Sequence, residues 1–405
     1  MPAETRRADI AILGDGLTAR CLALLLNRYL PGCRLERLHP VPKAAVDATS
    51  HRAIALSEGS RRILVELGVW PRIEQAAAAI VEIDVSDRGH PGSVRMKAAE
   101  QNLASYGHVI EYRDLTSLIA DELQERVTAS PKQVDYQQLR LRPVRGGMQI
   151  SAGQFQVEAQ LVLVADGALR QALQALGFGF LEKDYDQTAL TAELILSEAH
   201  GGLAFERFTG TGPVALLPLK PGGGRSRASL VWTLPPARAE ELFALPEQRF
   251  IAELNGVLGG RSVAVAKVRH RKLISLSRVL ASEQWRRHVI LLGSVAHSLH
   301  PVAGQGFNLT LRDIETLAKL LAQARAREEN LGDLALLESY GRQRSVDQRR
   351  VVAFSDNLPR LFANGNPLVA AGRNLGLLAL DAVPPLRHAF ARFGAGLHKP
   401  GVRAR

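Results

Sequence analysis

The chain has 405 residues, of which 46% are hydrophobic and 22% charged, and its formal net charge at pH 7 is +11. This length favours two connected domains, and the composition is that of a globular protein rather than a disordered one. The two cysteines exclude a disulfide framework and fit a reducing cytoplasm. The positive charge is compatible with nucleic acid, an anionic membrane surface or an anionic cofactor.

The basic residues carry no nucleic-acid-binding motif, so we expect no nucleic-acid partner. The stretch 387–405 contains no acidic residue, and it is compatible with contact to anionic lipid or with a solvated basic terminus. We expect no signal peptide, and no run of about eighteen apolar residues indicates a spanning helix. These features predict a cytoplasmic protein; if it acts on a lipid, we expect it to do so from the surface of the inner membrane, as a peripheral protein.

The N-terminal region predicts a strand at 9–13, a helix at 17–30 and a strand at 33–38, which together form a βαβ unit. Ser57 is a suitable N-cap for the helix that follows it, and Gly68 is a suitable stop. This order of elements is typical of a nucleotide-binding domain.

Short β-type runs separated by glycine and proline occupy 81–94 and 188–234, and they predict a separate antiparallel sheet. Between them, a helix at 118–125 and a buried strand at 160–165 return the chain to the first domain. We therefore expect interleaved domains.

The C-terminal half begins with a predicted helix at 247–258 and a strand at 288–292. A glycine-containing loop leads from that strand into a helix at 306–324, which is a second strand-loop-helix junction of nucleotide-binding character. A charged helix is expected at 334–350, followed by further helices interrupted by prolines.

A glycine motif lies at the first strand-helix junction, where Gly14, Gly16, Leu17, Thr18 and Ala19 follow one another around Asp15. The first glycine permits a tight turn, the second lets the backbone approach a pyrophosphate, and the small final residue allows close helix packing. A purely structural glycine turn is the rival interpretation. An acidic residue at the end of the second strand is expected to bind ribose hydroxyls, and the candidate is Glu36, which Arg37 follows directly.

Two further stretches end strands with glycine turns. Asp166 and Gly167 follow the strand at 160–165, although such a turn on its own is often structural. The loop 293–308 is the most specific stretch, because its several glycines allow many backbone amides to approach a flat or anionic ligand. Its distinctive residues are Gly293, Pro301, Gly304, Gly306 and Asn308.

Two histidines in this loop, His297 and His300, raise the question of a metal site. No carboxylate or cysteine accompanies them in the loop, so we interpret both as packing or supporting residues and predict no metal.

Several stretches together resemble the FAD-dependent ubiquinone-biosynthesis hydroxylases, which have the para-hydroxybenzoate hydroxylase fold, and especially the branch that acts on 2-polyprenyl-6-methoxyphenol. The resemblance extends over nearly the whole chain and is carried by RAIALSEGSRRILVELGVW, VSDRGHPG, AFERFTGTGPVALLPL, HPVAGQGFNLTLRD and FANGNPLVAAGRNLGLLALD. It implies a Rossmann-like FAD-binding domain, of mixed α/β and α+β class, interleaved with an antiparallel-sheet substrate domain and followed by a helical C-terminal region. The implied limits are 1–75, 98–178 and 280–335 for FAD binding, 76–97 and 179–279 for substrate, and 336–405 for the helical region.

The resemblance also implies which residues hold FAD. The first motif and Glu36 would bind the pyrophosphate and the adenosine ribose, Arg52 would neutralise phosphate charge, and Arg113 would lie near the ribityl chain or simply on the surface. The turn at Asp166 and Gly167 would complete the site. The isoalloxazine ring would be lined by Pro301, Gly304, Gln305, Gly306, Phe307 and Asn308.

One position departs from the family pattern. The third motif usually has Gly-Asp, whose acid binds the ribityl hydroxyls, whereas this chain has Gly293 and Ser294. A serine hydroxyl can form a hydrogen bond there, but not the stronger charge-assisted one, so we expect weaker FAD binding.

The implied reaction uses NADPH or NADH to reduce FAD, captures molecular oxygen as a flavin C4a-hydroperoxide and hydroxylates the ring of a polyprenylphenol. The cofactor supplies the difficult chemistry, and no catalytic base stands out in the sequence. We expect Phe205, Phe208, Leu216, Leu217 and Trp232 to form an apolar wall that faces the substrate, with ordinary sheet core as the rival interpretation for each. Two rival functions are a sister hydroxylase for another ring position and a weakly active FAD-binding scaffold that associates with ubiquinone-biosynthesis proteins.

Overall fold

The N-terminal βαβ unit is confirmed and forms the centre of a mainly parallel sheet. β1 (Arg6–Leu13) pairs in parallel with both β2 (Leu35–Pro40) and β11 (Phe155–Val164), and α1 (Leu17–Tyr29) connects β1 to β2. The computed structural model describes residues 6–41, 52–128, 130–300, 304–364 and 366–397. Within these ranges the central part of this sheet has the order β17-β18-β11-β1-β2-β8.

The remaining strands of this first sheet are short. An antiparallel extension runs from β11 to β10 and β9, and β18 pairs with β11 in parallel. Their bounds are β8 (Lys132–Val134), β9 (Arg140–Val144), β10 (Gly147–Ala152), β17 (Trp285–Arg286) and β18 (Val289–Leu291).

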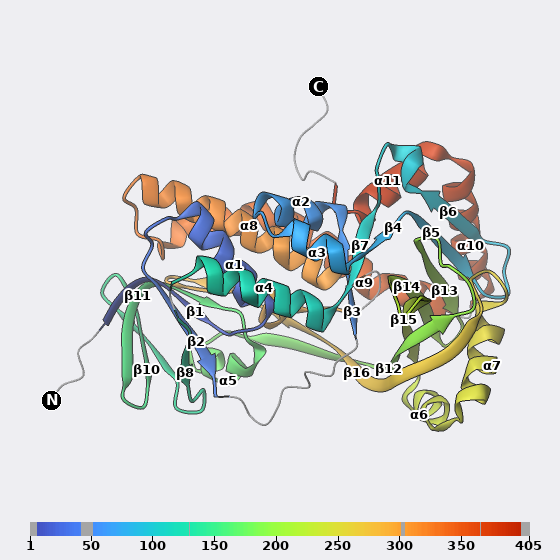
Figure 1. The fold of residues 1–405 in the computed structure, drawn as a ribbon. Coiled ribbons are helices and arrows are strands. Elements are labelled where there is room, and N and C mark those ends of the chain that lie inside the picture. The colour runs from blue at the N-terminus through green and yellow to red at the C-terminus, as the bar shows by residue number, and fades with distance from the viewer. Residues whose placement is uncertain (1–5, 42–51, 129, 301–303, 365, 398–405) are drawn as a thin grey trace.

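Helices α1, α4 (Tyr112–Arg126) and α8 (Gln305–Ala326) contribute apolar side chains to one core with this sheet. Figure 1 shows these helices on one side of the sheet, with the β10 hairpin on the other side. The core contains strand residues such as Ile10 and Leu163 together with helix residues such as Leu22 and Leu317, all essentially buried. Burial of this apolar surface holds the nucleotide-binding domain together.

The second sheet lies in the other lobe of the molecule (Figure 1). Its order is β19-β16-β12-β15-β14-β13-β5-β6. It is antiparallel as predicted except between β13 and β5, which pair in parallel. The bounds are β5 (Glu82–Asp87), β6 (Ser93–Lys97), β12 (Phe180–Leu196), β13 (Leu203–Thr209), β14 (Gly212–Gly222), β15 (Arg225–Leu234), β16 (Val265–Ala281) and β19 (His297–Ser298).

Each face of the second sheet has its own cover. α6 (Pro236–Ala244) and α7 (Glu247–Leu258) pack on one face, and the C-terminal helices pack on the other. A small sheet of β3 (Ala53–Ser57), β7 (Gly107–Glu111) and β4 (Ala78–Ile80) adjoins this second face. The nucleotide-binding lobe thus reaches the second sheet on the side opposite α6 and α7.

The other helices connect or flank these sheets. The helix predicted after Ser57 is α2 (Glu58–Glu66), and the Ser57 hydroxyl accepts a hydrogen bond from Ser60 N, as expected of an N-cap. The remaining bounds are α3 (Trp70–Ala76), α5 (Arg170–Ala175), α9 (Leu334–Ala363), α10 (Pro367–Ala382) and α11 (Pro384–Gly394), with 3-10 turns at Ala98–Gln101, Gly167–Leu169 and Gly293–Val295.

The helix predicted at 334–350 is longer than expected and continues to Ala363 across Pro359. A proline removes only one backbone donor, and tertiary packing compensates here. The Phe362 ring stacks on Phe208 of β13 with 3.8 Å between the ring centroids. This contact anchors the end of α9 to the second sheet.

The predicted domain limits stay a prediction. Segments 82–97 and 180–281 supply nearly all strands of the second sheet, which is close to the proposed substrate domain. β4, placed in that domain by the prediction, pairs instead with β7, and β19 extends the second sheet from the third glycine region.

Candidate active site

The first glycine turn joins β1 to α1. Gly14 has a φ of +128° and donates its N–H to Leu38 O at 2.8 Å, so the turn is tight and tied to β2. A Cβ atom on Gly14 would lie 3.2 Å from both Ala165 and Asp166. A Cβ on Gly16 would meet no atom within 4 Å, which leaves open space above the start of α1. Leu17 and Ala19 are buried beneath it.

The second turn follows β11 and lies directly against the first. The Asp166 carboxylate accepts a hydrogen bond from Ala168 N at 2.9 Å, so it caps its own 3-10 turn. Gly167 again leaves open space, with no atom within 4 Å of a Cβ placed there. The close approach of Asp166 to Gly14 is a consequence of the parallel pairing of β1 with β11.

The third turn follows β18 and meets the first at Thr18. Gly293 has a φ of +67°, and a Cβ placed on it would lie 2.7 Å from Thr18 Oγ1. Residues 18 and 293 are therefore in contact although they are distant in the sequence. All three predicted turns converge at the carboxyl ends of β1, β11 and β18, which is where ligands bind in open parallel sheets.

The start of α8 is fixed to the β3–α2 junction by one buried side chain. Asn308 Oδ1 accepts hydrogen bonds from Ser57 N at 2.8 Å and Ser60 Oγ at 2.7 Å. Its Nδ2 donates to Ala55 O at 2.8 Å and Gly304 O at 2.9 Å. All of its hydrogen-bonding positions are used within the protein, so it holds the loop in place and has none left for a ligand.

The other predicted residues of this loop lie around Asn308. Gly304 adopts the left-handed conformation with a φ of +60°, and a Cβ placed on Gly306 would meet no atom within 4 Å. Gln305 is buried and donates to Gly394 O at 3.3 Å, whereas Phe307 is partly buried against the main core. Pro301 lies outside the described residues.

The structure does not bring Glu36 to the first turn. Glu36 pairs with Ala11, and it is Leu38 that pairs with Leu13 at the end of β1. The Glu36 carboxylate forms an ion pair with Lys132 of β8. A role for Glu36 at the ribose stays a prediction, and His39 is the residue that follows the last β1-paired position.

Charged residues do surround the first turn. Arg20 Nη2 lies 2.7 Å from Asp15 Oδ2, and Arg37 Nη2 lies 3.4 Å from Asp15 Oδ1. Burial lowers the pKa of Arg37, and its side chain is only 9% exposed. Neither cation was among the predicted site residues, although Arg37 directly follows the predicted Glu36.

The two predicted arginines flank neighbouring strands of the small sheet. The Arg52 guanidinium stacks over the Tyr112 ring at 3.9 Å, and Arg113 is paired with Glu111 at 3.4 Å and Asp114 at 3.5 Å. The pairing of β3 with β7 brings them together at the start of α4. Both are at the surface, so either could turn toward an anionic ligand.

The two histidines of the third motif make protein contacts. His297 Nε2 lies 2.9 Å from Asp313 Oδ2, and both residues are buried. His300 lies 3.3 Å from Gln187 Oε1 and packs edge-on against Tyr185, and burial lowers the pKa of His300 to about 4. These contacts are those of packing residues.

The geometry fits an extended dinucleotide. The turns at Gly14, Asp166 and Gly293 meet, and the open space at Gly16 and Gly167 is a cradle in which a phosphate or a sugar can approach the backbone. The N-terminus of α1 adds a favourable electrostatic environment for a pyrophosphate. A family model for the FAD binding domain matches residues 7–355, which is most of the chain.

Proteins that are related to this chain over nearly their full length narrow the family assignment further. Ubiquinone hydroxylase UbiL of Rhodospirillum rubrum is 33% identical over 398 residues, covering 97% of this chain and 91% of that protein. This chain belongs to the FAD-dependent ubiquinone-biosynthesis hydroxylases. It is therefore a flavin-dependent aromatic hydroxylase, an oxidoreductase with FAD as its cofactor.

Another relative and two solved structures are consistent with this assignment. The 3-demethoxyubiquinol 3-hydroxylase of Escherichia coli is 28% identical over 400 residues, covering 96% of this chain and 98% of that protein. Among solved structures, p-nitrophenol 4-monooxygenase PnpA of Pseudomonas putida has a TM-score of 0.74 at 16% identity, covering 98% of this chain and all of that one. PqsL of P. aeruginosa, with a TM-score of 0.72 at 20% identity, covers 92% and 100%. These two structures support the fold.

The predicted substrate wall of the hydroxylase is largely wrong. Phe205, Leu216 and Trp232 lie on the face of the second sheet that packs against α6 and α7. Phe208 and Leu217 lie on the opposite face, in the core that also contains Ala55 of β3. Strand alternation separates the two sets, and the sequence did not reveal which face the two helices would cover.

Ser294 stands at the position where the resemblance led us to expect an acid. It lies in the 3-10 turn Gly293–Val295 and is exposed. Its hydroxyl is therefore free of packing constraints and accessible to a ligand. The predicted effect on FAD affinity stays a prediction.

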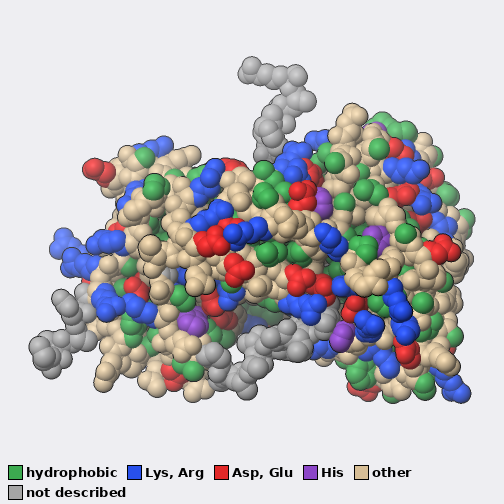
Figure 2. All heavy atoms as spheres, viewed as in Figure 1, with side chains coloured by type: hydrophobic (Ala, Val, Ile, Leu, Met, Phe, Trp, Pro, Cys, Tyr) green, Lys and Arg blue, Asp and Glu red, His purple; other side chains and the backbone are tan. Residues whose placement is uncertain are grey.

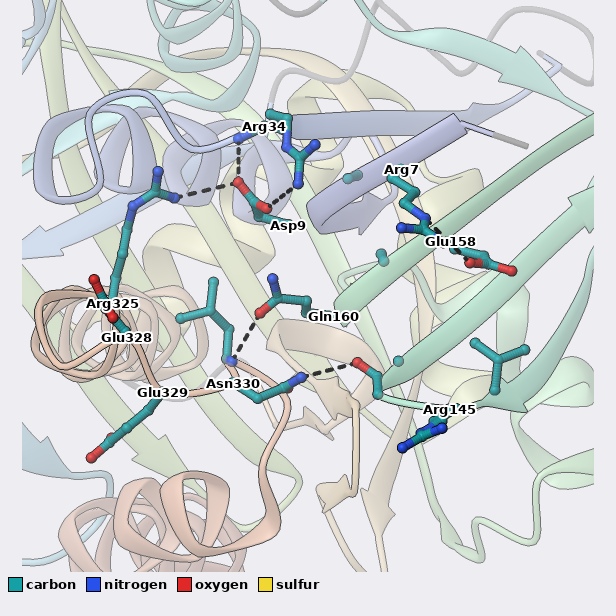
Figure 3. Close-up of a pocket in the computed structure, with 16 residues that line it drawn as sticks. Arg7, Asp9, Arg34, Arg145, Glu158, Gln160, Arg325, Glu328, Glu329 and Asn330 are labelled. Atoms are coloured by element: carbon teal, nitrogen blue, oxygen red, sulfur yellow. Dashed lines mark hydrogen bonds and ion pairs between the residues drawn. The ribbon is translucent and has the colours of Figure 1, made fainter. Parts of the chain in front are cut away.

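A large open cavity of about 580 Å³ lies at the other end of the parallel sheet. Figure 3 shows Arg34 and Arg325 turned toward Asp9 at the start of β1, with ion-pair distances of 2.9 and 3.4 Å. Glu158 and Arg7 form another pair at its edge. The cavity is at the amino end of β1, so it is separate from the glycine turns, and its charges largely neutralise one another.

Proposed function

We propose that the protein hydroxylates the aromatic ring of a polyprenylated phenol, of the 2-polyprenyl-6-methoxyphenol type, in ubiquinone biosynthesis. The observation that carries the proposal is the contact between Gly293 and Thr18, which brings the third glycine turn against the first and supports a single cradle for the cofactor. The relatives UbiL, a ubiquinone hydroxylase, and 3-demethoxyubiquinol 3-hydroxylase support a ubiquinone precursor as the substrate.

The protein's own contribution is binding and orientation. When bound, FAD would accept electrons from NADPH or NADH and activate molecular oxygen. The turns at Gly14 and Asp166 would hold the dinucleotide, and the Asn308 hydrogen bonds would fix the loop beside the ring. The sheet face that carries Phe208 and Leu217 would enclose the phenol and exclude water.

A sister hydroxylase that acts at another ring position is the nearest rival, and the name of the E. coli relative favours it. A weakly active FAD-binding scaffold is the second rival, favoured by Ser294 in place of the usual acid. Expression in strains that each lack one ring-hydroxylation step separates the three. Restored ubiquinone in the strain without the methoxyphenol step supports the proposal, restoration only in a strain without another step supports the sister enzyme, and no restoration with FAD bound supports the scaffold.

We further propose that the C-terminal helices rest on an anionic bilayer, because a polyprenyl tail partitions into the membrane. α10 exposes Leu368, Leu375 and Leu378, which are 84%, 66% and 42% exposed, and its only exposed charged residue is Asp381. The stretch 387–405 beyond it has no acidic residue. Apolar side chains beside basic ones suit an anionic lipid surface. Among the described residues, no helix is long and apolar enough to span a bilayer.

Sedimentation with vesicles containing phosphatidylglycerol tests this surface. Replacing Leu368 and Leu375 by Asp is expected to lower binding at least 10-fold, since each leucine contributes about 1.5–3 kcal/mol when buried. The control is Leu181→Asp, which changes a leucine that is 60% exposed on β12. If the double Asp variant binds the vesicles as strongly as the Leu181→Asp control, the proposed lipid surface is contradicted. It is also contradicted if the wild type binds neutral vesicles as strongly as anionic ones. Figure 2 shows basic side chains spread over the visible face of both lobes. The Leu181→Asp control therefore shows how much vesicle binding is lost when an acidic charge is added away from α10.

A further inference from the structure

One acidic side chain on the second sheet faces the cofactor-binding side. Glu206 is in the middle of β13, between Phe205 and Arg207, which point the other way. Phe205 packs with α6 and α7, and Arg207 Nη1 donates to Leu258 O at the end of α7 at 2.6 Å. Because side chains alternate along a strand, Glu206 projects from the opposite face.

The neighbours of Glu206 on that face confirm its direction. Ala204 and Phe208, two residues to either side, belong to the core shared with the small sheet and the C-terminal helices. Ala55, part of the same cluster, accepts the Asn308 hydrogen bond and lies against Gly304. One continuous packed region thus leads from the flavin loop to the face that carries Glu206.

The Glu206 carboxyl takes no part in a hydrogen-bond or ion-pair network of the described residues. Among the residues that the structure describes, its carboxyl has no hydrogen-bond or ion-pair partner, and its cross-strand neighbours are Ala215 and Val85. The side chain keeps intermediate exposure, while burial raises the pKa of the carboxyl to about 7. A half-buried carboxyl without a polar partner is unfavourable for folding, which favours a functional reason for its presence.

We propose that Glu206 is the catalytic base that contacts the substrate ring and takes the proton of its phenolic hydroxyl. This inference rests on the proposed function. The phenolic O–H bond breaks, and the proton moves to a carboxylate oxygen of Glu206. The phenol oxygen keeps the electron pair, which raises the electron density of the ring. The hydroxylated ring carbon then loses its hydrogen as a proton to water, which makes the ring aromatic again, and the carboxyl returns its own proton to the phenol oxygen. A base is most effective when its pKa lies near the working pH.

The neighbouring charged groups on the elements packed around this face are already paired. Asp87 of β5 pairs with Arg373 of α10 at 2.8 Å, and Glu111 of β7 pairs with Arg227 of β15 at 2.7 Å. On α9, Asp356 pairs with Arg278 and Arg360. Since burial alone raises the Glu206 pKa, none of these charges accounts for its shift.

The test uses the FAD-loaded protein, NADPH and 2-geranyl-6-methoxyphenol as the probe. Glu206→Gln is expected to lower kcat about 100-fold at pH 8, with bound FAD unchanged. In the wild type, kcat/KM falls as the pH drops below about 7, the pKa of Glu206, and this limb is lost in the Gln variant. Glu206→Asp keeps a base and the pH-dependent limb at a reduced rate. The control is Glu198→Gln, which changes an exposed turn residue.

Failure of the base and failure of the function give different results. A wild type that hydroxylates the probe while the Gln variant keeps its rate and pH profile overturns the role of Glu206. A wild type that hydroxylates none of a series of prenylated phenols overturns the proposed function and the base with it. A Gln variant that has lost FAD as well as activity also contradicts the proposal, because it indicates a structural role.

Discussion

Asn308 Oδ1 accepts a hydrogen bond from Ser57 N at 2.8 Å, which joins the start of α8 to the N-cap of α2 across 251 positions of sequence. The bond joins two distant segments into one wall of the proposed cofactor site. The Asn308 Nδ2 bond to Ala55 O, at 2.8 Å, adds a second link between the start of α8 and β3. Asn308 therefore holds the start of α8 against β3 and α2, a role that the glycine motif alone did not predict.

Asn308→Ala is expected to destabilise the protein by about 2–4 kcal/mol, because several buried groups lose their partners. FAD affinity should fall at the same time, since the loop beside the ring loosens. Thermal unfolding and flavin fluorescence measure the two effects. The control is Asn27→Ala on the exposed side of α1. An Asn308 variant as stable as the control contradicts the assignment.

Gly293→Ala should weaken FAD binding at least 10-fold. The new Cβ would lie 2.7 Å from Thr18 Oγ1, and the φ of +67° costs an alanine about 1–2 kcal/mol. Adding Thr18→Ala should restore part of the affinity by removing the clash. Gly256→Ala in α7 is the matched control, since its Cβ would meet no atom within 4 Å. Titration with FAD measures the affinity of each variant. If Gly293→Ala binds FAD as tightly as the wild type, the first and third turns do not meet as described.

Ser294→Asp is expected to strengthen FAD binding about 10-fold, because a carboxylate forms a charge-assisted hydrogen bond with a ribityl hydroxyl. The exposed position of Ser294 leaves room for the longer side chain. Comparing FAD retained after gel filtration measures the gain. Weaker retention than in the wild type would show that this turn does not face the ribityl chain.

The buried ionic cluster between α8 and α9 should be sensitive to the loss of its cation. Arg344 Nε donates to Asp313 Oδ1 at 2.6 Å and Nη2 donates to Asp347 Oδ2 at 2.5 Å. Arg344→Leu leaves two buried carboxylates short of charge, which costs about 3–5 kcal/mol. Urea unfolding measures the loss. The control is Arg342→Leu, whose side chain is 70% exposed, and equal effects of the two changes would contradict this account.

Glu206 also predicts how stability depends on pH. Burial raises its pKa from 4.5 to about 7, so between these values the folded protein holds a proton that the unfolded chain has released. The free energy of unfolding should therefore fall as the pH rises from 4.5 to about 7. Glu206→Gln should remove this part of the decline. Melting temperatures of both proteins at pH 5 and at pH 8 provide the check, and parallel pH dependence of the two would contradict it.

The sequence predicted the elements and the turns better than the contacts between them. Hydrophobic period and glycine placement were sufficient for β1, α1 and the loop before α8, since those signals are local. The sequence did not predict which face of the second sheet α6 and α7 would cover. Phe205 and Phe208 are the same residue type, so their side chains could not be assigned to one face or the other. Glu206 was missed for the same reason: an acid within FERF carries no sign of burial. Glu36 was selected by its type, and only the β1–β2 register shows how far it lies from the turn.

Oxygen transfer to the ring is the most direct test of the central claim. The FAD-loaded protein is incubated with NADPH, 2-geranyl-6-methoxyphenol and oxygen gas labelled with the heavy isotope, and the product is analysed by mass spectrometry. The account predicts one labelled oxygen atom in a new ring hydroxyl for each NADPH consumed. Labelled hydrogen peroxide as the sole product, with every prenylated phenol in the series, would contradict it.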